Sequence, residues 1–155
     1  MSGMAEQGGT AGAEQVRVLV ADDEAIIRIL LNHVLTAQSY EVVLAEDGQE
    51  AIEILQRERF DLVITDITMP RATGMDVLHT SKTVDPACPV MLITGFPSED
   101  LISQMYGAGA EEYIPKPFDL QSIKDAVARL LARKQGVESE NRVREAVPAY
   151  GYQTA

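Results

Sequence analysis

A run of apolar and β-branched residues that ends on an acidic side chain is the feature that most constrains the fold of this chain. Residues 62–65 (LVIT) run directly into Asp66, within the longer stretch 61–70 (DLVITDITMP). An apolar run without polar alternation is typical of a strand that is covered on both faces, as in a parallel sheet. Asp66 would then stand at the carboxyl end of that strand, which is the edge where open α/β sheets bind ligands.

The rest of the chain repeats a pattern of short strands and amphipathic helices. Further strands are predicted at residues 16–21, 40–45, 90–94 and 112–114, and helices at 26–39, 48–58, 75–84, 99–106 and 120–134. Ser98 and Asp119 are predicted to cap the last two helices. Because parallel neighbouring strands need crossover connections, five alternating pairs predict an α/β fold with a doubly wound parallel sheet.

The 155 residues fit one domain with two tails. Residues 1–14 contain four glycines and no large aliphatic residue beyond methionine, which predicts a flexible tail. Residues 15–134 form the predicted domain. Residues 135–155 are polar, and Glu–Arg pairs at helical spacing predict at most a marginal helix there.

Charge and composition exclude several classes of function. The formal net charge of -11, without a cluster of Lys and Arg, argues against direct binding to nucleic acid. Cys88 is the only cysteine, so one chain can form neither a disulfide nor a cysteine-based zinc site. The sequence contains no membrane-length apolar run and no apolar signal core. We therefore expect a cytoplasmic protein without membrane contact.

Five side chains are expected to meet at the carboxyl edge of the sheet, namely Asp22, Asp23, Asp66, Thr94 and Lys116. Three carboxylates at ~4 to 6 Å from one another would repel by roughly 1 to 4 kcal/mol per pair. A cation relieves this repulsion, and a site of oxygen ligands without His or Cys favours Mg²⁺. The lysine and the threonine hydroxyl could hold further anionic oxygens. The pattern predicts a site for a phosphoryl group on Asp66.

Four segments at these separations, VLVADDE, DLVITDITMP, VMLITGF and EEYIPKPF, resemble the receiver domain of two-component response regulators. The resemblance covers about residues 16–134. It implies a flavodoxin-like (βα)5 fold with strand order 2-1-3-4-5. It also implies a signalling protein with Mg²⁺-dependent self-phosphorylation and self-dephosphorylation, rather than an enzyme that acts on a separate substrate.

The resemblance implies a role for each site residue. Asp66 would accept the phosphoryl group from a sensor histidine kinase or a histidine phosphotransfer protein. Asp23 would bind Mg²⁺ directly, Asp22 would bind it through water or as a second ligand, and the backbone carbonyl of Thr68 would complete the protein's share.

The remaining implied roles concern the response to phosphorylation. Lys116 would neutralise the phosphoryl charge. Thr94 and Tyr113 would form the switch, with Thr94 turning to a phosphoryl oxygen and Tyr113 swinging inward behind it. The face that changes would consist of the fourth helix, the fifth strand and the fifth helix, and the Lys116–Pro117 bond is commonly cis in such domains.

Other functions are weaker matches. A flavodoxin-like FMN carrier needs a phosphate loop where this chain has acidic residues after the first strand. A haloacid-dehalogenase-like phosphatase has a second Asp two residues after its nucleophile, and Thr68 stands at that position here. A receiver-like module that binds partners without phosphorylation stays as the alternative.

The output of such a protein is open at this point. No effector domain follows residue 134, so we expect a single-domain regulator that acts through protein contacts or passes phosphate onward. It would be a monomer or a phosphorylation-dependent homodimer. The sequence names neither the kinase nor the downstream protein partner.

Overall fold

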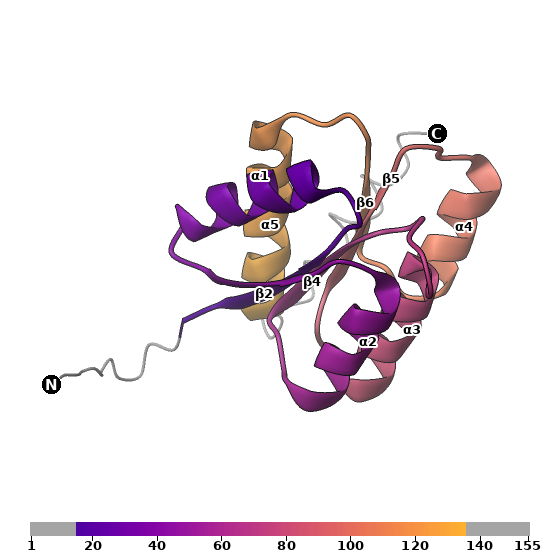
Figure 1. Ribbon diagram of the computed structural model, residues 1–155, viewed down its shortest axis with the longest axis horizontal. Helices are drawn as coiled ribbons and strands as arrows, with labels where there is room; N and C mark the ends of the chain where they lie inside the picture. The colour runs from indigo at the N-terminus through magenta and orange to yellow at the C-terminus, as the bar shows by residue number, and fades with distance from the viewer. Residues whose placement is uncertain (1–14, 136–155) are drawn as a thin grey trace, which may run out of the picture.

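The computed structural model describes residues 15–135, which form one five-stranded parallel sheet with helices on both faces (Figure 1). The predictions for residues 1–14 and 136–155 lie outside the described part. The strands are β2 (Arg17–Ala21), β3 (Glu41–Ala45), β4 (Leu62–Asp66), β5 (Val90–Thr94) and β6 (Glu112–Pro115). Their order in the sheet is β3-β2-β4-β5-β6. The predicted order of second, first, third, fourth and fifth strand is therefore confirmed.

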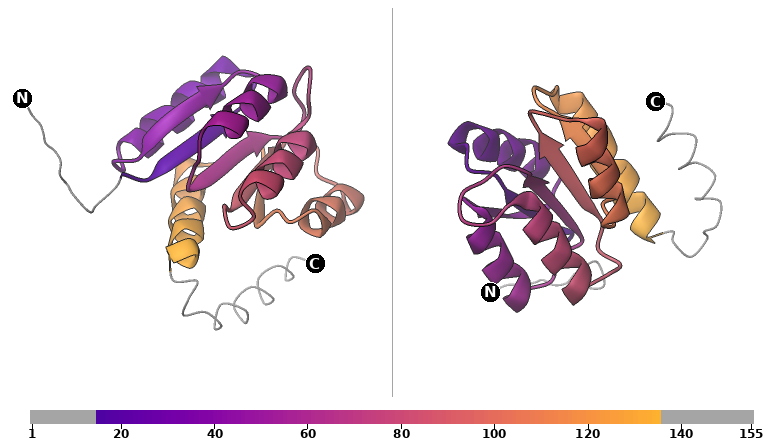
Figure 2. Two further views of the ribbon diagram at one scale, coloured as in Figure 1. Left: turned by 90° about the horizontal axis from the view of Figure 1, so that it is seen from below. Right: turned by 90° about the vertical axis from the view of Figure 1, so that its right-hand side faces the viewer.

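Five helices cover the sheet in two layers (Figures 1 and 2). Helices α1 and α5 pack on one face, and α2, α3 and α4 pack on the other. Across residues 15–135, none of the helices combines the length and the apolar character that a transmembrane span requires. The helices are α1 (Ala25–Thr36), α2 (Gly48–Arg57), α3 (Gly74–Val84), α4 (Glu99–Gly107) and α5 (Leu120–Gln135).

The central strand β4 is buried along its whole length, as its continuous apolar sequence predicts. Its alternate side chains enter two separate cores. Val63 packs with the α2–α3–α4 layer, whereas Leu62 and Ile64 pack with the α1–α5 layer. Burying one such side chain contributes roughly 1.5–3 kcal/mol. The two cores together fix the strand that carries Asp66.

Local capping signals set several helix ends. Ser98 accepts a hydrogen bond from the Leu101 backbone amide at 3.1 Å, and Asp119 accepts one from Ser122 at 2.7 Å. Both predicted caps are confirmed. Thr73 adds a capping box at α3, because its hydroxyl accepts from the Asp76 amide while the Asp76 carboxylate accepts from the Thr73 amide.

Helix α1 is more apolar than its core face requires. The sequence predicts an amphipathic helix from Ile26, but only Leu31, Val34 and Leu35 are buried. Ile26 and Ile29 are 64% and 61% exposed. Periodicity identified the helix, but it did not separate the buried stripe from a second, exposed apolar stripe.

Gly74 lies against the backbone of Asp66. A Cβ atom at position 74 would stand 2.1 Å from the carbonyl oxygen of Asp66 and 2.8 Å from the Cα of Ile67. The Gly74 amide also donates a hydrogen bond to the Ile67 carbonyl at 2.8 Å. The first residue of α3 is therefore a glycine because the helix begins in contact with the strand end that positions Asp66.

Replacing Gly74 by Ala should destabilise the fold, because the new methyl group meets backbone atoms that cannot rotate away. Overpacking of this kind costs about 1–3 kcal/mol. Urea denaturation of wild type and variant measures the difference. The matched control is Gly107→Ala in α4, where nothing lies within 4 Å of the added atom. That control should be neutral or slightly stabilising, and an equal loss in both variants would contradict the close approach at Gly74.

Candidate functional site

Three carboxylates lie together at the carboxyl edge of the sheet. Asp22 and Asp23 follow β2 directly, and Asp66 is the last residue of the neighbouring strand β4. One carboxylate oxygen of each lies within 4.8 Å of the other two. Asp22 and Asp66 are buried, whereas Asp23 is exposed. The structure thus brings together the three acidic residues that the sequence places at this edge.

Asp22 is the most deeply buried of the three. Its Oδ1 atom accepts a hydrogen bond from the Glu24 backbone amide at 2.8 Å. Its Oδ2 atom accepts no hydrogen bond from any residue that the structure describes. Burial raises the pKa of Asp22 to about 6; the Glu24 amide opposes this rise, and the charge of Asp66 adds to it. Ionising the Asp22 carboxylate in the folded protein therefore costs free energy unless a positive charge lies next to it.

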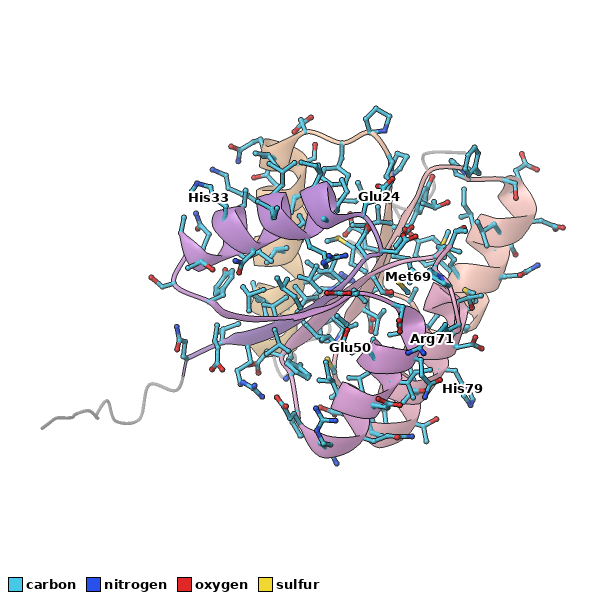
Figure 3. The ribbon with its side chains drawn as sticks, viewed as in Figure 1. Glu24, His33, Glu50, Met69, Arg71 and His79 are labelled. Carbon is cyan, nitrogen blue, oxygen red and sulfur yellow. The ribbon has the colours of Figure 1, made fainter. Side chains whose placement is uncertain are left out.

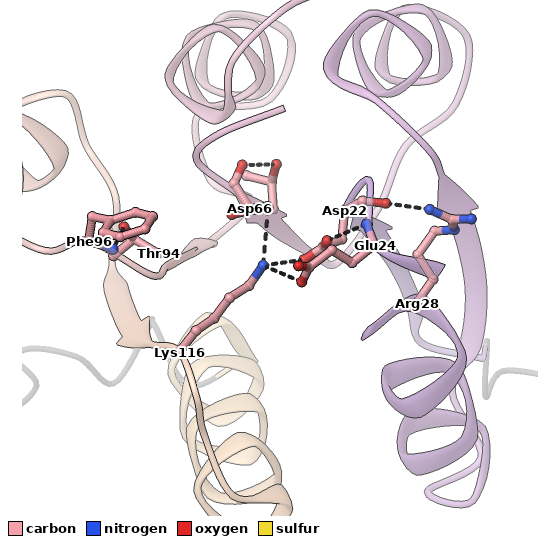
Figure 4. A network of polar contacts seen from close by, with 8 residues as sticks. Asp22, Glu24, Arg28, Asp66, Thr94, Phe96 and Lys116 are labelled. Carbon is pink, nitrogen blue, oxygen red and sulfur yellow. Dashed lines mark hydrogen bonds and ion pairs between the residues drawn. The ribbon is translucent and has the colours of Figure 1, made fainter. Parts of the chain in front are cut away.

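Lys116 forms ion pairs with three carboxylates at this edge, those of Asp22, Glu24 and Asp66. Its ammonium nitrogen lies 3.3 Å from Asp22 Oδ2, 3.0 Å from Glu24 Oε1 and 3.2 Å from Asp66 Oδ2 (Figure 4). Burial alone would lower the pKa of Lys116, but the three carboxylates outweigh burial and raise it. Lys116 is therefore permanently charged at physiological pH.

Burial and the Lys116 ammonium group have opposite effects on the pKa of Asp66. Burial raises the pKa of its carboxyl, while the charge and hydrogen bond of Lys116 act in the opposite direction. Asp66 is 5% exposed, so it sits below the surface but within reach of solvent. A carboxylate that is fixed in place and only partly neutralised is typical of functional sites.

The acidic cluster fits a hard divalent cation. All of its donor atoms are carboxylate oxygens, and Asp22 Oδ2, which accepts no hydrogen bond from the described residues and faces the Lys116 ammonium group at 3.3 Å, could serve as a ligand. His33 and His79 lie on the exposed surfaces of α1 and α3, away from the edge (Figure 3). Cys88 is buried at the opposite end of the sheet, just before β5. The chemistry of the site is therefore that of oxygen ligands only.

Thr94 and Tyr113 lie on the two strands beyond Asp66. Thr94 is the last residue of β5, which pairs with β4, and it is buried. Its hydroxyl accepts a hydrogen bond from the Phe96 amide at 3.0 Å. Tyr113 in β6 is half-buried, and its ring meets that of Tyr106 edge-on with centroids 6.3 Å apart. The switch role of both residues stays a prediction.

Thr68 is exposed in the loop after β4. The same loop carries Met69, which is buried, and Arg71 (Figure 3). Arg71 Nε pairs with Asp47 Oδ2 at 3.2 Å, which ties the loop to the start of α2. The backbone carbonyl of Thr68 as a metal ligand stays a prediction.

Two residues of this edge have no role in the sequence-based prediction. Glu24 contacts Lys116 across 92 positions of the chain, and its only sequence signal is that it is the third consecutive acidic residue after β2. Arg28 Nη1 donates to the backbone carbonyl of Asp22 at 2.7 Å. Its position within a helix gives no hint that it reaches back to the strand end.

The response regulator receiver domain family model matches residues 18–128. Among curated proteins, the sporulation initiation phosphotransferase F of Bacillus subtilis is 36% identical over 118 residues, which cover 76% of this chain and 95% of that protein. Other curated matches are longer transcriptional or response regulators, and this chain spans 51% to 57% of their length.

Solved structures give the same result. A CheY-like receiver domain protein from Methanospirillum hungatei aligns with a TM-score of 0.76 and 25% identity, over 79% of this chain and 98% of that one. The response regulator TrrA of Thermotoga maritima, solved in complex with Mg²⁺ and BeF, aligns with a TM-score of 0.67 and 34% identity, over 75% and 99% of the two chains.

Replacing Asp22 by Asn should stabilise the metal-free protein at pH 7. The change removes a buried charge next to Asp66, and the Asn side-chain oxygen can keep the hydrogen bond from the Glu24 amide. A pKa raised from 3.8 to about 6 corresponds to a gain on the order of 3 kcal/mol. Urea denaturation in the presence of EDTA measures it, with exposed Asp125→Asn as the control.

The sign of the pH dependence follows from the raised pKa. Between about pH 4 and 6, the native state keeps a proton on Asp22 that the unfolded chain has already released, so the cost of this group grows as pH rises through that window. The advantage of Asp22→Asn should therefore be full at pH 7 and shrink as pH falls from 6 towards 4. A constant advantage over this range would contradict the raised pKa.

Proposed function

Because the chain belongs to the response regulator receiver family, we propose that it is a phosphorylation switch of a two-component system in which Asp66 is the phosphoacceptor. The donor is a phosphorylated histidine of a sensor kinase or a histidine phosphotransfer protein. The observation that carries the proposal is the buried Asp66 carboxylate, held 3.2 Å from the Lys116 ammonium group and beside two further carboxylates.

The transfer step uses this geometry directly. A carboxylate oxygen of Asp66 forms a bond to phosphorus while the phosphorus–nitrogen bond of the donor histidine breaks. The electron pair of that bond returns to the imidazole, which takes up a proton. Lys116 faces the phosphoryl oxygens as a compact point charge and offsets the negative charge that accumulates there.

Mg²⁺ is the cation that this site would hold, through Asp22, Asp23, Asp66 and the backbone carbonyl of Thr68. Bound there, Mg²⁺ would neutralise the carboxylates and the incoming phosphoryl oxygens. The support is the all-oxygen donor set, in which the buried Asp22 Oδ2 atom accepts no hydrogen bond from the described residues. The Mg²⁺ and BeF complex of the similar TrrA protein adds to this support.

Phosphorylation would act on downstream proteins through the elements beyond β5, namely α4, β6 and α5. A phosphoryl group adds about -2 charge and three acceptor oxygens. The Thr94 hydroxyl would exchange its hydrogen bond with the Phe96 amide for one to a phosphoryl oxygen. The Tyr113 ring would then move inward, away from its contact with Tyr106. The face of α4, β6 and α5 would thereby change its affinity for a downstream protein.

The donor protein would dock on α1. The exposed apolar side chains of Ile26, Ile29 and Leu30 project from this helix. Leu30 also lines a groove between α1 and the loop before α5, together with Ile27, Phe118 and Lys116. An exposed apolar stripe next to a reactive carboxylate suits an interface that delivers a phosphohistidine to it.

Wild-type protein incubated with acetyl phosphate and Mg²⁺ should gain one phosphoryl group, and Asp66→Asn should gain none. The amide cannot act as the carboxylate nucleophile, although it preserves the size of the side chain. Intact-mass spectrometry reads out both. Asp125→Asn on α5 is the matched control and should be phosphorylated like wild type, whereas EDTA should abolish the gain. Equal labelling of Asp66→Asn, or none of wild type, would leave a phosphorylation-independent binding module as the better explanation.

Replacing Ile29 by Ala should slow phosphotransfer from a partner protein without affecting the reaction with acetyl phosphate. Losing one well-packed apolar contact at an interface costs about 1–2 kcal/mol, or roughly 5- to 30-fold in rate. The donor is the kinase that labels wild type fastest in a panel of purified, autophosphorylated histidine kinases. His79→Ala, on the exposed surface of α3, is the control. An equal loss in both variants would rule out α1 as the docking face.

A further inference from the structure

Glu24 makes a contact that the phosphoryl chemistry does not require. Its Oε1 atom lies 3.0 Å from Lys116 Nζ, closer than either Asp66 Oδ2 at 3.2 Å or Asp22 Oδ2 at 3.3 Å. The Lys116 ammonium group donates hydrogen bonds to both Glu24 and Asp66 (Figure 4). Lys116 is thus shared between the phosphoacceptor and a carboxylate outside the metal-binding cluster.

The Glu24 side chain contacts Lys116 rather than the end of the helix that it precedes. Glu24 is the N-cap residue of α1, but its side chain makes no capping hydrogen bond with the helix. The carboxylate instead reaches across to the loop after β6, where Lys116 stands. The Glu24 side chain is 59% exposed, whereas those of Asp22 and Asp66 are 1% and 6% exposed. Glu24 is therefore the outermost and most easily rehydrated of the three partners.

We propose that Glu24 is a positioning residue that holds Lys116 in the unphosphorylated protein and competes with the phosphoryl group for its ammonium. The inference rests on the proposed function of Asp66 as phosphoacceptor. In this arrangement Glu24 keeps Lys116 close to Asp66 but only partly available to a phosphoryl oxygen.

The donor capacity of the ammonium group makes the competition unavoidable. A lysine ammonium has three donors, and here three carboxylates already surround it. A phosphoryl group on Asp66 brings three strong acceptor oxygens and about -2 charge to the same place. Asp66 is esterified in that step and Asp22 is a proposed Mg²⁺ ligand, so Glu24 is the carboxylate that stays in competition with the phosphoryl oxygens for Lys116. Glu24 is the partner whose release costs least, because water replaces the ammonium around an exposed carboxylate.

The exchange also connects the phosphorylation site with the groove beside α1. Glu24 and Lys116 both line that groove, together with Ile27, Leu30 and Phe118. With the phosphoryl group in place, the Glu24 carboxylate is no longer neutralised by Lys116. The groove wall then carries a free negative charge that it lacks in the unphosphorylated protein.

Isothermal titration calorimetry of beryllofluoride binding in the presence of Mg²⁺ tests the competition. Glu24→Gln keeps the length of the side chain but removes its charge, so the variant should bind beryllofluoride about two- to five-fold more tightly than wild type, the range expected for a partly exposed ion pair. Glu46→Gln is the matched control, because Glu46 is an exposed glutamate of the next strand end that faces Arg28 at 4.0 Å. It should leave the affinity within the error of wild type.

A second measurement needs no phosphoryl analogue. The ammonium resonance of Lys116 in ¹⁵N-labelled, Mg²⁺-free protein should be observable by NMR in wild type and in Glu46→Gln, because three carboxylates slow its exchange with water. In Glu24→Gln the resonance should shift and broaden. Equal affinities of Glu24→Gln and Glu46→Gln, or an unaltered Lys116 resonance in Glu24→Gln, would overturn the inference.

The two proposals fail in different ways. Failure of wild type to bind beryllofluoride overturns the phosphoacceptor function and the competition that rests on it. Normal binding by wild type with no tightening in Glu24→Gln overturns only the role of Glu24. Urea denaturation of all three proteins is the control for the fold and should give equal midpoints.

Discussion

The constraint on which the structure depends is that one ammonium group, Lys116, faces carboxylates buried at the edge of a parallel sheet. Charges of like sign in a partly buried site repel each other strongly, and only a fold with a large apolar core on both faces of the sheet can hold them there. The strands β2, β4 and β5 supply that core and end at the site. The apolar packing is thus concentrated below the edge, and the buried charged groups are concentrated on it.

The sequence predicted the central part of this arrangement because its signals are local. A buried parallel strand needs an apolar run, and a helix end needs a capping residue, so β4 and the caps at Ser98 and Asp119 can be recognised within ten residues. The acidic residues could be assigned to one edge because parallel strands all end on the same side. Strand order required the resemblance to a family, since no local signal specifies which strands are neighbours.

The remaining features depend on contacts that form only in the folded chain. Glu24 meets Lys116 across 92 positions, and Gly74 is constrained by the backbone of a strand that ends eight residues earlier. The exposed stripe on α1 was missed for a related reason. Periodicity records that Ile26 and Ile29 are apolar, but only the packing of α1 against the sheet decides that they face solvent. Such residues matter for the site because they determine how its charged groups are held and approached.

Arg28 anchors the inner surface of α1 to the end of β2. Its guanidinium group binds the backbone carbonyl of Asp22, so the orientation of the helix and the geometry of the acidic turn are set by the same contact. Ile26 and Ile29, on the outer surface, take no part in it. The outer side chains of α1 can therefore be exchanged without disturbing the contact that fixes the acidic turn.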